Sequence, residues 1–356
     1  MVTALCLYSG SLASRVAARL VARSPLVERT ALLHFRSPFF TEDERLREQV
    51  KDEWPGAIFR TQSLKKDYRR LANIPPGRPF SLKRSCLSCR TLMLVRAIRY
   101  MERIKADFIV TGDLVGRHGL GPEELERITE DLGVGGQVVR PLSARLLPPS
   151  LPEREGWLDE SALCDLQDGD DDGLADLARG LHLPMDDPMH VHARCKLTHP
   201  GFGRRLENLF EEDRFTLNAL KLLEFSLYYK YPPDVKIVLA VDEEEKRALQ
   251  TFFLPQDLRV YLPSPRSPLA LVRTEWVDKS PQEVDEIIAL AARIAVTHSA
   301  TAPGRSVPVK YRFEKDDETS QLNIMAFSTV AEIGRVCFAC NVSSPGAPKE
   351  SQVSLS

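Results

Sequence analysis

Apolar runs alternate with helix-like stretches along the first 150 residues, and this alternation constrains the fold more than any other feature of the chain. The expected strands cover residues 2–8, 30–35, 57–61 and 107–111, and the expected helices cover residues 12–23, 43–54 and 89–105. Continuous apolar strands joined by helices are typical of a parallel sheet with helices on both faces. The sequence therefore predicts a doubly wound α/β domain over residues 1–150.

The rest of the chain differs in composition. Three prolines and the acidic run at 168–173 predict a connector between short helices, one of them at 174–181, in a mostly helical segment over residues 151–232. Strand and helix signals resume at residue 235, and Ser280, Pro281 and Glu283 have the pattern of a helix start with a capping box. We expect a C-terminal α/β domain over residues 233–342 and a disordered tail over residues 343–356.

The pattern of apolar residues also bears on location. No stretch of the chain approaches the roughly 18 consecutive apolar residues that a membrane span needs. The N-terminus has neither the basic region nor the cleavage site of a secretory signal. We therefore expect a cytoplasmic protein that does not enter a membrane, and the sequence leaves its oligomeric state open.

The formal net charge is −2, but the basic residues gather in one segment. Residues 60–90 contain nine basic residues and one acid, which gives this segment a net charge of +8 and leaves −10 for the remainder. Such a segment is a solvated loop in one interpretation and a surface that binds nucleic-acid phosphates in the other. The cations that would contact RNA are Lys65, Lys66, Arg69, Arg70, Lys83 and Arg84.

Seven cysteines, an odd number, in a chain without an export signal indicate reduced thiols rather than a disulfide framework. Cys6 and Cys164 have the apolar or helical context of core residues. The other five form two CxxC pairs and one isolated residue, namely Cys86 with Cys89, Cys337 with Cys340, and Cys195.

Metal binding is one interpretation of these cysteines. The two CxxC pairs could together form a zinc site, although the roughly 250 residues between them make an unusual spacing for a structural site. His190 and His192, close to Cys195, either add metal ligands or lie on the surface. The pair Cys337 and Cys340, near the tail, has no distinguishing context of its own.

Small residues follow the first expected strand and lead directly into a helix. They are Ser9, Gly10, Ser11 and Ser14. Small residues let the backbone approach an anion, its N–H groups point at the anion's oxygens, and the helix dipole favours negative charge. The segment therefore predicts a phosphate site.

This segment resembles the PP-loop, SGGxDS, of the ATP pyrophosphatase superfamily, which includes tRNA thiolation enzymes. Most of the chain is similar to one subgroup, the PP-loop proteins that resemble tRNA 4-thiouridine and 2-thiouridine synthetases. Five landmarks of that subgroup occur in order: SPFF at 37–40, CxxC at a helix start at 86–89, VTGD at 110–113, an RPLSA run at 140–149, and a single Cys before an LT-P-F-RRL string at 195–206. The C-terminal domain is similar to the NFACT-type RNA-binding domain found in such proteins.

The resemblance implies an adenine nucleotide alpha hydrolase-like fold and an ATP-dependent sulfurtransferase that acts on uridine in tRNA. In such an enzyme ATP, with Mg²⁺, adenylates a uracil carbonyl oxygen, and sulfur then displaces AMP. The residues that would hold the nucleotide are Ser9, Gly10, Ser11, Ser14, Thr111, Gly112 and Asp113.

The resemblance also implies a role for three cysteines. Cys86, Cys89 and Cys195 would hold a 4Fe-4S cluster with one open iron, or two of them would act as a persulfide relay with the third structural. The sulfur would come from sulfide or from a protein that carries a persulfide.

At the nucleotide site the sequence departs from the family pattern. Ser11 stands in place of the second glycine, and Ala13 stands in place of an aspartate that helps to organise the pyrophosphate and Mg²⁺. Asp113 replaces a glutamate, and the segment at 116–120 differs as well. Two functions are therefore open, a divergent thiolation enzyme or a catalytically inactive paralogue that binds RNA or adenine nucleotide.

Overall fold

The computed structural model divides into two compact units, Met1–Thr198 and His199–Ser356, which are described separately. The structure describes residues 2–40, 46–159, 161, 163–185, 195–199, 201–212, 215–264, 267–301 and 304–339. Cys195 belongs to the first unit. The division into three segments stays a prediction, and the tail expected at 343–356 lies outside the described residues.

The first unit contains a five-stranded sheet in which all strands are parallel. Its strands are β1 (Val2–Leu7), β2 (Val27–Arg36), β3 (Ile58–Ser63), β4 (Phe108–Val110) and β5 (Val138–Val139), in the order β3-β2-β1-β4-β5. The chain builds the sheet outward from β1 to β3 and then returns to place β4 on the other side of β1. This confirms the predicted parallel α/β sheet, and it puts the reversal of strand order between β1 and β4, where open sheets of this kind bind ligands.

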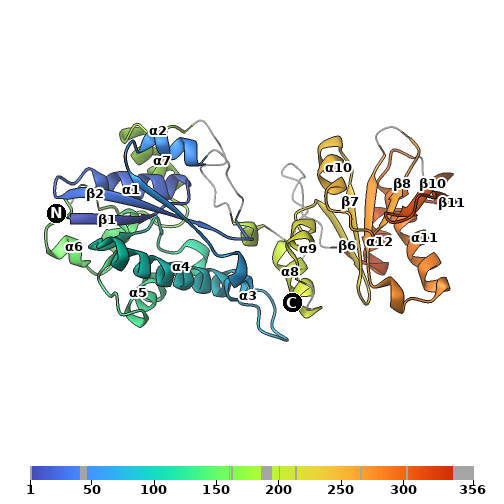
Figure 1. The fold of residues 1–356 in the computed structure, drawn as a ribbon, viewed down its shortest axis with the longest axis horizontal. Helices are drawn as coiled ribbons and strands as arrows, with labels where there is room; N and C mark the ends of the chain where they lie inside the picture. Colours follow the sequence, from blue (N-terminus) through green and yellow to red (C-terminus); the bar gives the residue numbers. More distant parts are fainter. Residues whose placement is uncertain are drawn as a thin grey trace, which may run out of the picture. The chain divides into compact units, whose positions relative to one another are not determined.

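Helices cover both faces of this sheet (Figure 1). On one face lie α1 (Leu12–Ala22), α2 (Leu46–Glu53) and α7 (Asp171–Gly180), and on the other lie α4 (Leu82–Ile104) and α5 (Pro122–Asp131). The short helix α3 (Tyr68–Ala72) packs against α4, and α6 covers Leu151–Arg154. Alternate residues near β1, Ala4, Cys6 and Tyr8, are buried in one apolar core with helix α1, as expected for a strand covered on that face.

Helix α4 begins earlier than the sequence predicts. The apolar spacing places its start at Cys89, whereas the helix starts at Leu82, where the hydroxyl of Ser81 accepts a hydrogen bond from the backbone N–H of Arg84 at 3.3 Å. This N-cap sets the start, and the apolar residues of the first turns, Leu82, Cys86 and Leu87, pack in a small separate core with Leu120 and Leu125. Cys86 and Cys89 therefore lie inside the helix rather than at its opening.

The acidic run in the middle of the chain is only partly a connector. Its last residues belong to α7, and Asp171 and Asp172 stand in the first turn of that helix, where carboxylates are favourable. Before the helix, Gln167 forms an isolated parallel bridge with Val115.

The second unit contains a seven-stranded sheet whose paired strands are antiparallel, in the order β11-β10-β8-β9-β7-β6-β12. Its strands are β6 (Leu227–Tyr231), β7 (Val235–Ala240), β8 (Leu258–Tyr261), β9 (Leu269–Arg273), β10 (Ser306–Phe313), β11 (Ser320–Met325) and β12 (Phe338–Ala339). Its helices are α8 (Phe202–Glu211), α9 (Leu217–Leu222), α10 (Glu243–Gln250), α11 (Pro281–Thr297) and α12 (Val330–Val336). The capping box predicted at Ser280 and Glu283 starts α11. Across the described parts of both units, no helix is both long and apolar enough to cross a membrane.

Candidate functional site

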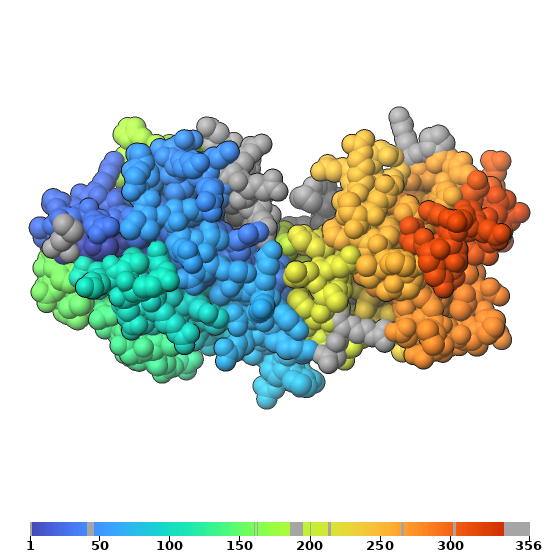
Figure 2. Space-filling model, viewed as in Figure 1, coloured from blue at the N-terminus to red at the C-terminus, as the bar shows by residue number. Residues whose placement is uncertain are grey.

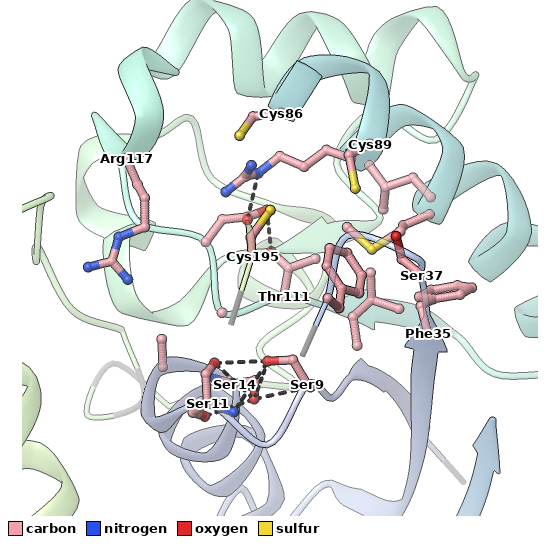
Figure 3. Close-up of a pocket in the computed structure, with 18 of the residues that line it drawn as sticks. Ser9, Ser11, Ser14, Phe35, Ser37, Cys86, Cys89, Thr111, Arg117 and Cys195 are labelled. Atoms are coloured by element: carbon pink, nitrogen blue, oxygen red, sulfur yellow. Dashed lines mark hydrogen bonds and ion pairs between the residues drawn. The ribbon is translucent and has the colours of Figure 1, made fainter. Parts of the chain in front are cut away.

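A cavity of about 240 Å³ opens in the first unit at the carboxyl ends of β1 and β4 (Figure 3). The loop between β1 and α1 lines one side with serine hydroxyls, and three cysteines line the other. The residues that follow β4 line it as well. Segments that are far apart in the sequence therefore meet at the point where the strand order reverses.

The serine loop is organised around the start of α1. Gly10 has a φ of +82°, a left-handed backbone conformation that favours glycine. Ser11 is the N-cap of α1, and its hydroxyl accepts from the backbone N–H of Ser14 at 3.5 Å. The Ser9 hydroxyl lies 2.9 Å from that of Ser11 and 3.2 Å from that of Ser14 (Figure 3). Three hydroxyls and the first N–H groups of an eleven-residue helix thus gather at one place, an arrangement suited to an anion.

Thr111, Gly112 and Asp113 follow β4, and all three line the cavity. The Asp113 carboxylate accepts one hydrogen bond from Arg90 Nε at 2.9 Å and another from the Thr111 hydroxyl at 3.0 Å. Arg140 Nε lies 3.8 Å from the same carboxylate. Burial alone would raise the pKa of Asp113, but Arg90 and Arg140 hold this pKa below its usual value, so the group is a carboxylate at neutral pH.

Arg90 and Arg140 are functional candidates that the sequence did not reveal as such. Arg90 appears there only as the last cation of the basic segment, and Arg140 only as the first residue of the RPLSA run. The position of Arg90, directly after Cys89 on the same helix, is the one local signal that could have indicated it.

The three cysteines expected at the site do line this cavity (Figure 3). Cys86 and Cys89 come from α4, and Cys195 comes from a distant segment that forms an antiparallel bridge with Phe40. The backbone N–H of Lys196 also donates to the carbonyl of Phe39 at 2.8 Å, so residues of the SPFF segment hold the chain at Cys195 in place.

Burial keeps these thiols neutral. It raises the pKa of Cys195 to about 12, and it also raises the pKa values of Cys86 and Cys89. Arg90 opposes this shift at each thiol, whereas neighbouring thiols reinforce it at Cys89 and Cys195. At neutral pH the cavity therefore holds thiols rather than thiolates.

Cys86 has an imidazole neighbour. Its Sγ lies 3.1 Å from Nδ1 of His118. Burial lowers the pKa of His118, and the charges of Arg90 and Arg117 lower it further, so the ring is neutral at neutral pH. A neutral imidazole at this distance can exchange a proton with the thiol. The sequence singled out the segment around His118 only as a departure from the family pattern.

Metal ligands are not assembled in the described part of the chain. There, no three or more His, Cys, Asp or Glu side chains are grouped so as to hold a metal ion. Cys337, from the zinc interpretation, is buried in the core of the second unit. Cys340, His190 and His192 lie outside the described residues.

The six cations expected to contact RNA differ in their surroundings. Lys66, Arg69 and Arg70 are exposed, and Lys65 is half-buried. The ammonium group of Lys83 forms an ion pair with Glu124. The Arg84 side chain donates to the carbonyls of Asn73 at 2.9 Å and Pro79 at 2.6 Å. Arg84 therefore shapes the loop between α3 and α4, a loop that protrudes from the unit (Figure 2).

Comparison with known proteins adds little to this geometry. No protein-family model matches the chain, and no curated protein matches it. Among solved structures, the chain is similar to the C-terminal part of the fibronectin/fibrinogen-binding protein from Streptococcus suis. The two are 11% identical with a TM-score of 0.27, over 46% of this chain and 74% of that one.

Proposed function

We propose that this chain is a PP-loop ATP-dependent sulfurtransferase that replaces a uracil carbonyl oxygen of tRNA with sulfur. One observation carries the proposal: Cys86, Cys89 and Cys195 line the same cavity as the serine loop of residues 9–14. A loop that binds the phosphates of ATP allows the uracil oxygen to be activated, and thiols deliver the sulfur that replaces it. Both steps act on the same base, so the loop and the thiols must lie close together.

The serine loop and the start of α1 would hold the phosphates of ATP. The uracil oxygen attacks the α-phosphorus, and pyrophosphate leaves. One cavity cysteine first takes the outer sulfur of a persulfide carried by the donor protein, and the donor's thiol leaves. The persulfide so formed attacks the activated carbon, and AMP leaves with the oxygen. A second cysteine attacks the first and releases the new thiocarbonyl, which leaves a disulfide that an external dithiol must reduce. His118 would accept the proton of Cys86 when that thiol acts as a nucleophile.

The resemblance also implies a 4Fe-4S cluster on the three thiols. We assign sulfur transfer to the thiols themselves, because the neutral imidazole of His118, 3.1 Å from the sulfur of Cys86, can accept the proton of a nucleophilic thiol. Iron and acid-labile sulfide measured after anaerobic purification test this choice, since one cluster per chain would contradict it.

Release of pyrophosphate from ATP in the presence of bulk tRNA and a persulfide donor, such as cysteine persulfide, tests the function. We expect release by the wild type, and thiolated uridine in the digested tRNA. Cys86→Ala and Cys195→Ala should keep pyrophosphate release and lose thiolation. A wild type that releases no pyrophosphate and forms no thiouridine would contradict the proposal.

A second function is a catalytically inactive paralogue that binds RNA or adenine nucleotide. Ala13 favours it, because this residue lines the cavity without the carboxylate that the family uses there. ATP binding without turnover, both in the wild type and in Ala13→Asp, would identify such a protein. Turnover only in Ala13→Asp would identify a lapsed enzyme.

We further propose tRNA as the partner, bound by residues 60–90 and by the C-terminal domain. The exposed cations Lys66, Arg69 and Arg70 support this assignment for the first of these surfaces.

A further inference from the structure

The cavity has an excess of cations. Among the described residues that line it, Asp113 is the one carboxylate, whereas Arg90, Arg117 and Arg140 are three guanidinium groups. Both oxygens of Asp113 are already engaged, one by Arg90 at 2.9 Å and one by Thr111 at 3.0 Å. Mg²⁺ in nucleotide sites is usually held by one or two carboxylates together with phosphate oxygens. The described lining offers no free carboxylate, so the Mg²⁺ that the resemblance implies does not fit these residues.

Arg140 adds an unsatisfied donor. Its side chain is 2% exposed, and Nη2 donates to the carbonyl of Leu125 at 2.9 Å. Its Nε has no hydrogen-bond partner among the described residues, and the nearest Asp113 oxygen, at 3.8 Å, is too far away. Nη1 also lies 3.4 Å from a carboxylate oxygen of Glu126. Because Arg140 lines the cavity, its buried positive charge favours an anion bound there.

Arg117 stands at the edge of the cavity (Figure 3). Its guanidinium is held by Asp168 at 3.0 Å and lies 3.7 Å from Asp171. These two carboxylates are about half exposed, at 47% and 55%, so water screens their attraction. A phosphate with more than one negative charge can compete with them for the guanidinium.

We propose that the cavity binds a polyphosphate, such as that of a nucleoside triphosphate, through its arginines and serine loop without a divalent cation. Guanidinium groups match phosphate geometry with two parallel hydrogen bonds, and their fixed charge does the neutralising that Mg²⁺ does elsewhere. That the nucleotide is ATP rests on the proposed function. That polyphosphate binds without Mg²⁺ rests on the arginines and serine hydroxyls that line the cavity.

Calorimetric titration of the full chain with ATP and with inorganic tripolyphosphate, each in EDTA and in excess Mg²⁺, tests the proposal. We expect both ligands to bind in EDTA about as tightly as in Mg²⁺. Binding that needs Mg²⁺ would overturn the inference and leave the proposed function standing. Tripolyphosphate binding in EDTA without ATP binding would support the inference and contradict the proposed function. Absence of binding by either ligand would contradict both.

Two substitutions sharpen the test. Arg117→Ala should weaken tripolyphosphate binding at least about tenfold in both buffers, because a charged hydrogen bond to phosphate is removed. Arg179→Ala removes the same charge from the exposed surface of α7 and should leave binding unchanged. Equal affinity of Arg117→Ala and wild type would overturn the role of this arginine.

Ala13 provides the converse test, because it lines the cavity and is 5% exposed. Ala13→Asp should bind tripolyphosphate at least about tenfold more weakly in EDTA and regain affinity with Mg²⁺, since it supplies a free carboxylate. Ala13→Asn has the same shape without the charge and should not acquire this dependence on Mg²⁺. Circular dichroism melting confirms that both variants fold. If Ala13→Asp does not fold, the wild-type and Arg117→Ala titrations still decide the question.

Discussion

Gly112 lies directly against the start of α1, so that a Cβ on this residue would stand 2.7 Å from the backbone nitrogen of Ser14. The same Cβ would stand 2.8 Å from the carbonyl oxygen of Ala13. These neighbours are backbone atoms of a helix, which cannot move aside as a flexible side chain can. The absence of a side chain at Gly112 therefore lets the end of β4 lie close to the serine loop.

We expect Gly112→Ala to lower the free energy of unfolding by about 1–3 kcal/mol, because the added methyl forces the backbone apart. It should also abolish tripolyphosphate binding, since the serine loop shifts. Urea unfolding and calorimetry measure the two effects. Gly180→Ala, at the end of α7 where a Cβ meets no atom within 4 Å, should change stability by less than about 1 kcal/mol and leave binding intact. Wild-type stability and binding in Gly112→Ala would refute the close approach of β4 to the helix.

Asp113 should matter for stability as well as for the site. Asp113→Asn leaves Arg90 without its counter-charge and leaves the buried Arg140 with Glu126 alone, so we expect a loss of about 3 kcal/mol at pH 7. Asp168→Asn breaks a more exposed pair with Arg117 and should cost less than about 1 kcal/mol. Equal losses in the two variants, measured by urea unfolding, would contradict this ranking.

The pH dependence of that loss has a defined sign. The pKa of Asp113 is lowered in the folded chain, so its contribution is present above the unfolded value of about 3.9 and is lost as the pH falls through the folded value. The difference in unfolding free energy between wild type and Asp113→Asn should therefore be constant from pH 7 to about pH 5 and shrink below about pH 4. A difference that shrinks between pH 7 and pH 5 would show that the pKa is not lowered.

The cavity thiols should react slowly with iodoacetamide at neutral pH, because only the thiolate is nucleophilic and burial raises the pKa of each thiol. For Cys195, whose pKa is about 12, we expect the alkylation rate to rise about tenfold per pH unit from pH 7 to 9 without a plateau. Peptide mass spectrometry follows each thiol separately. The urea-unfolded chain is the control, and its rates should level off near pH 9. A plateau below pH 9 in the folded chain would mean that the thiol ionises normally.

The exposed cations of α3 should contribute to RNA binding. Arg69→Ala with Arg70→Ala should weaken tRNA binding and reduce the slope of log affinity against log salt by about 1 for each RNA phosphate that these cations neutralise in the wild type. Arg47→Ala with Lys51→Ala removes the same charge from exposed positions on α2 and should have little effect. If both double variants bind tRNA like the wild type, residues 60–90 are a solvated loop.

The succession of apolar and small residues along the chain was enough to predict the parallel sheet and the part of the cavity that lies at the strand ends. The strands predicted at 2–8 and 107–111 match β1 and β4 to within one residue at each end. The serine loop and Thr111 each follow one of these strands, and the carboxyl ends of parallel strands meet at one edge, so their proximity follows from the sequence. The two-residue strand β5 was not predicted, because it is too short to show a period.

Only the tertiary structure brought the cations to the cavity. Arg90 reaches it from α4, Arg117 from the turn after β4, and Arg140 from the end of β5, and no spacing in the sequence relates these three. Cys195 arrives through its bridge with Phe40, which joins segments about 155 residues apart. The spacing of apolar residues shows which face of a helix or strand is buried. Which polar side chains come together depends instead on the order of the strands and on how the helices cross the sheet. The sequence therefore predicted which residues follow the strands, the serine loop and Thr111. It did not predict that three arginines would gather around them.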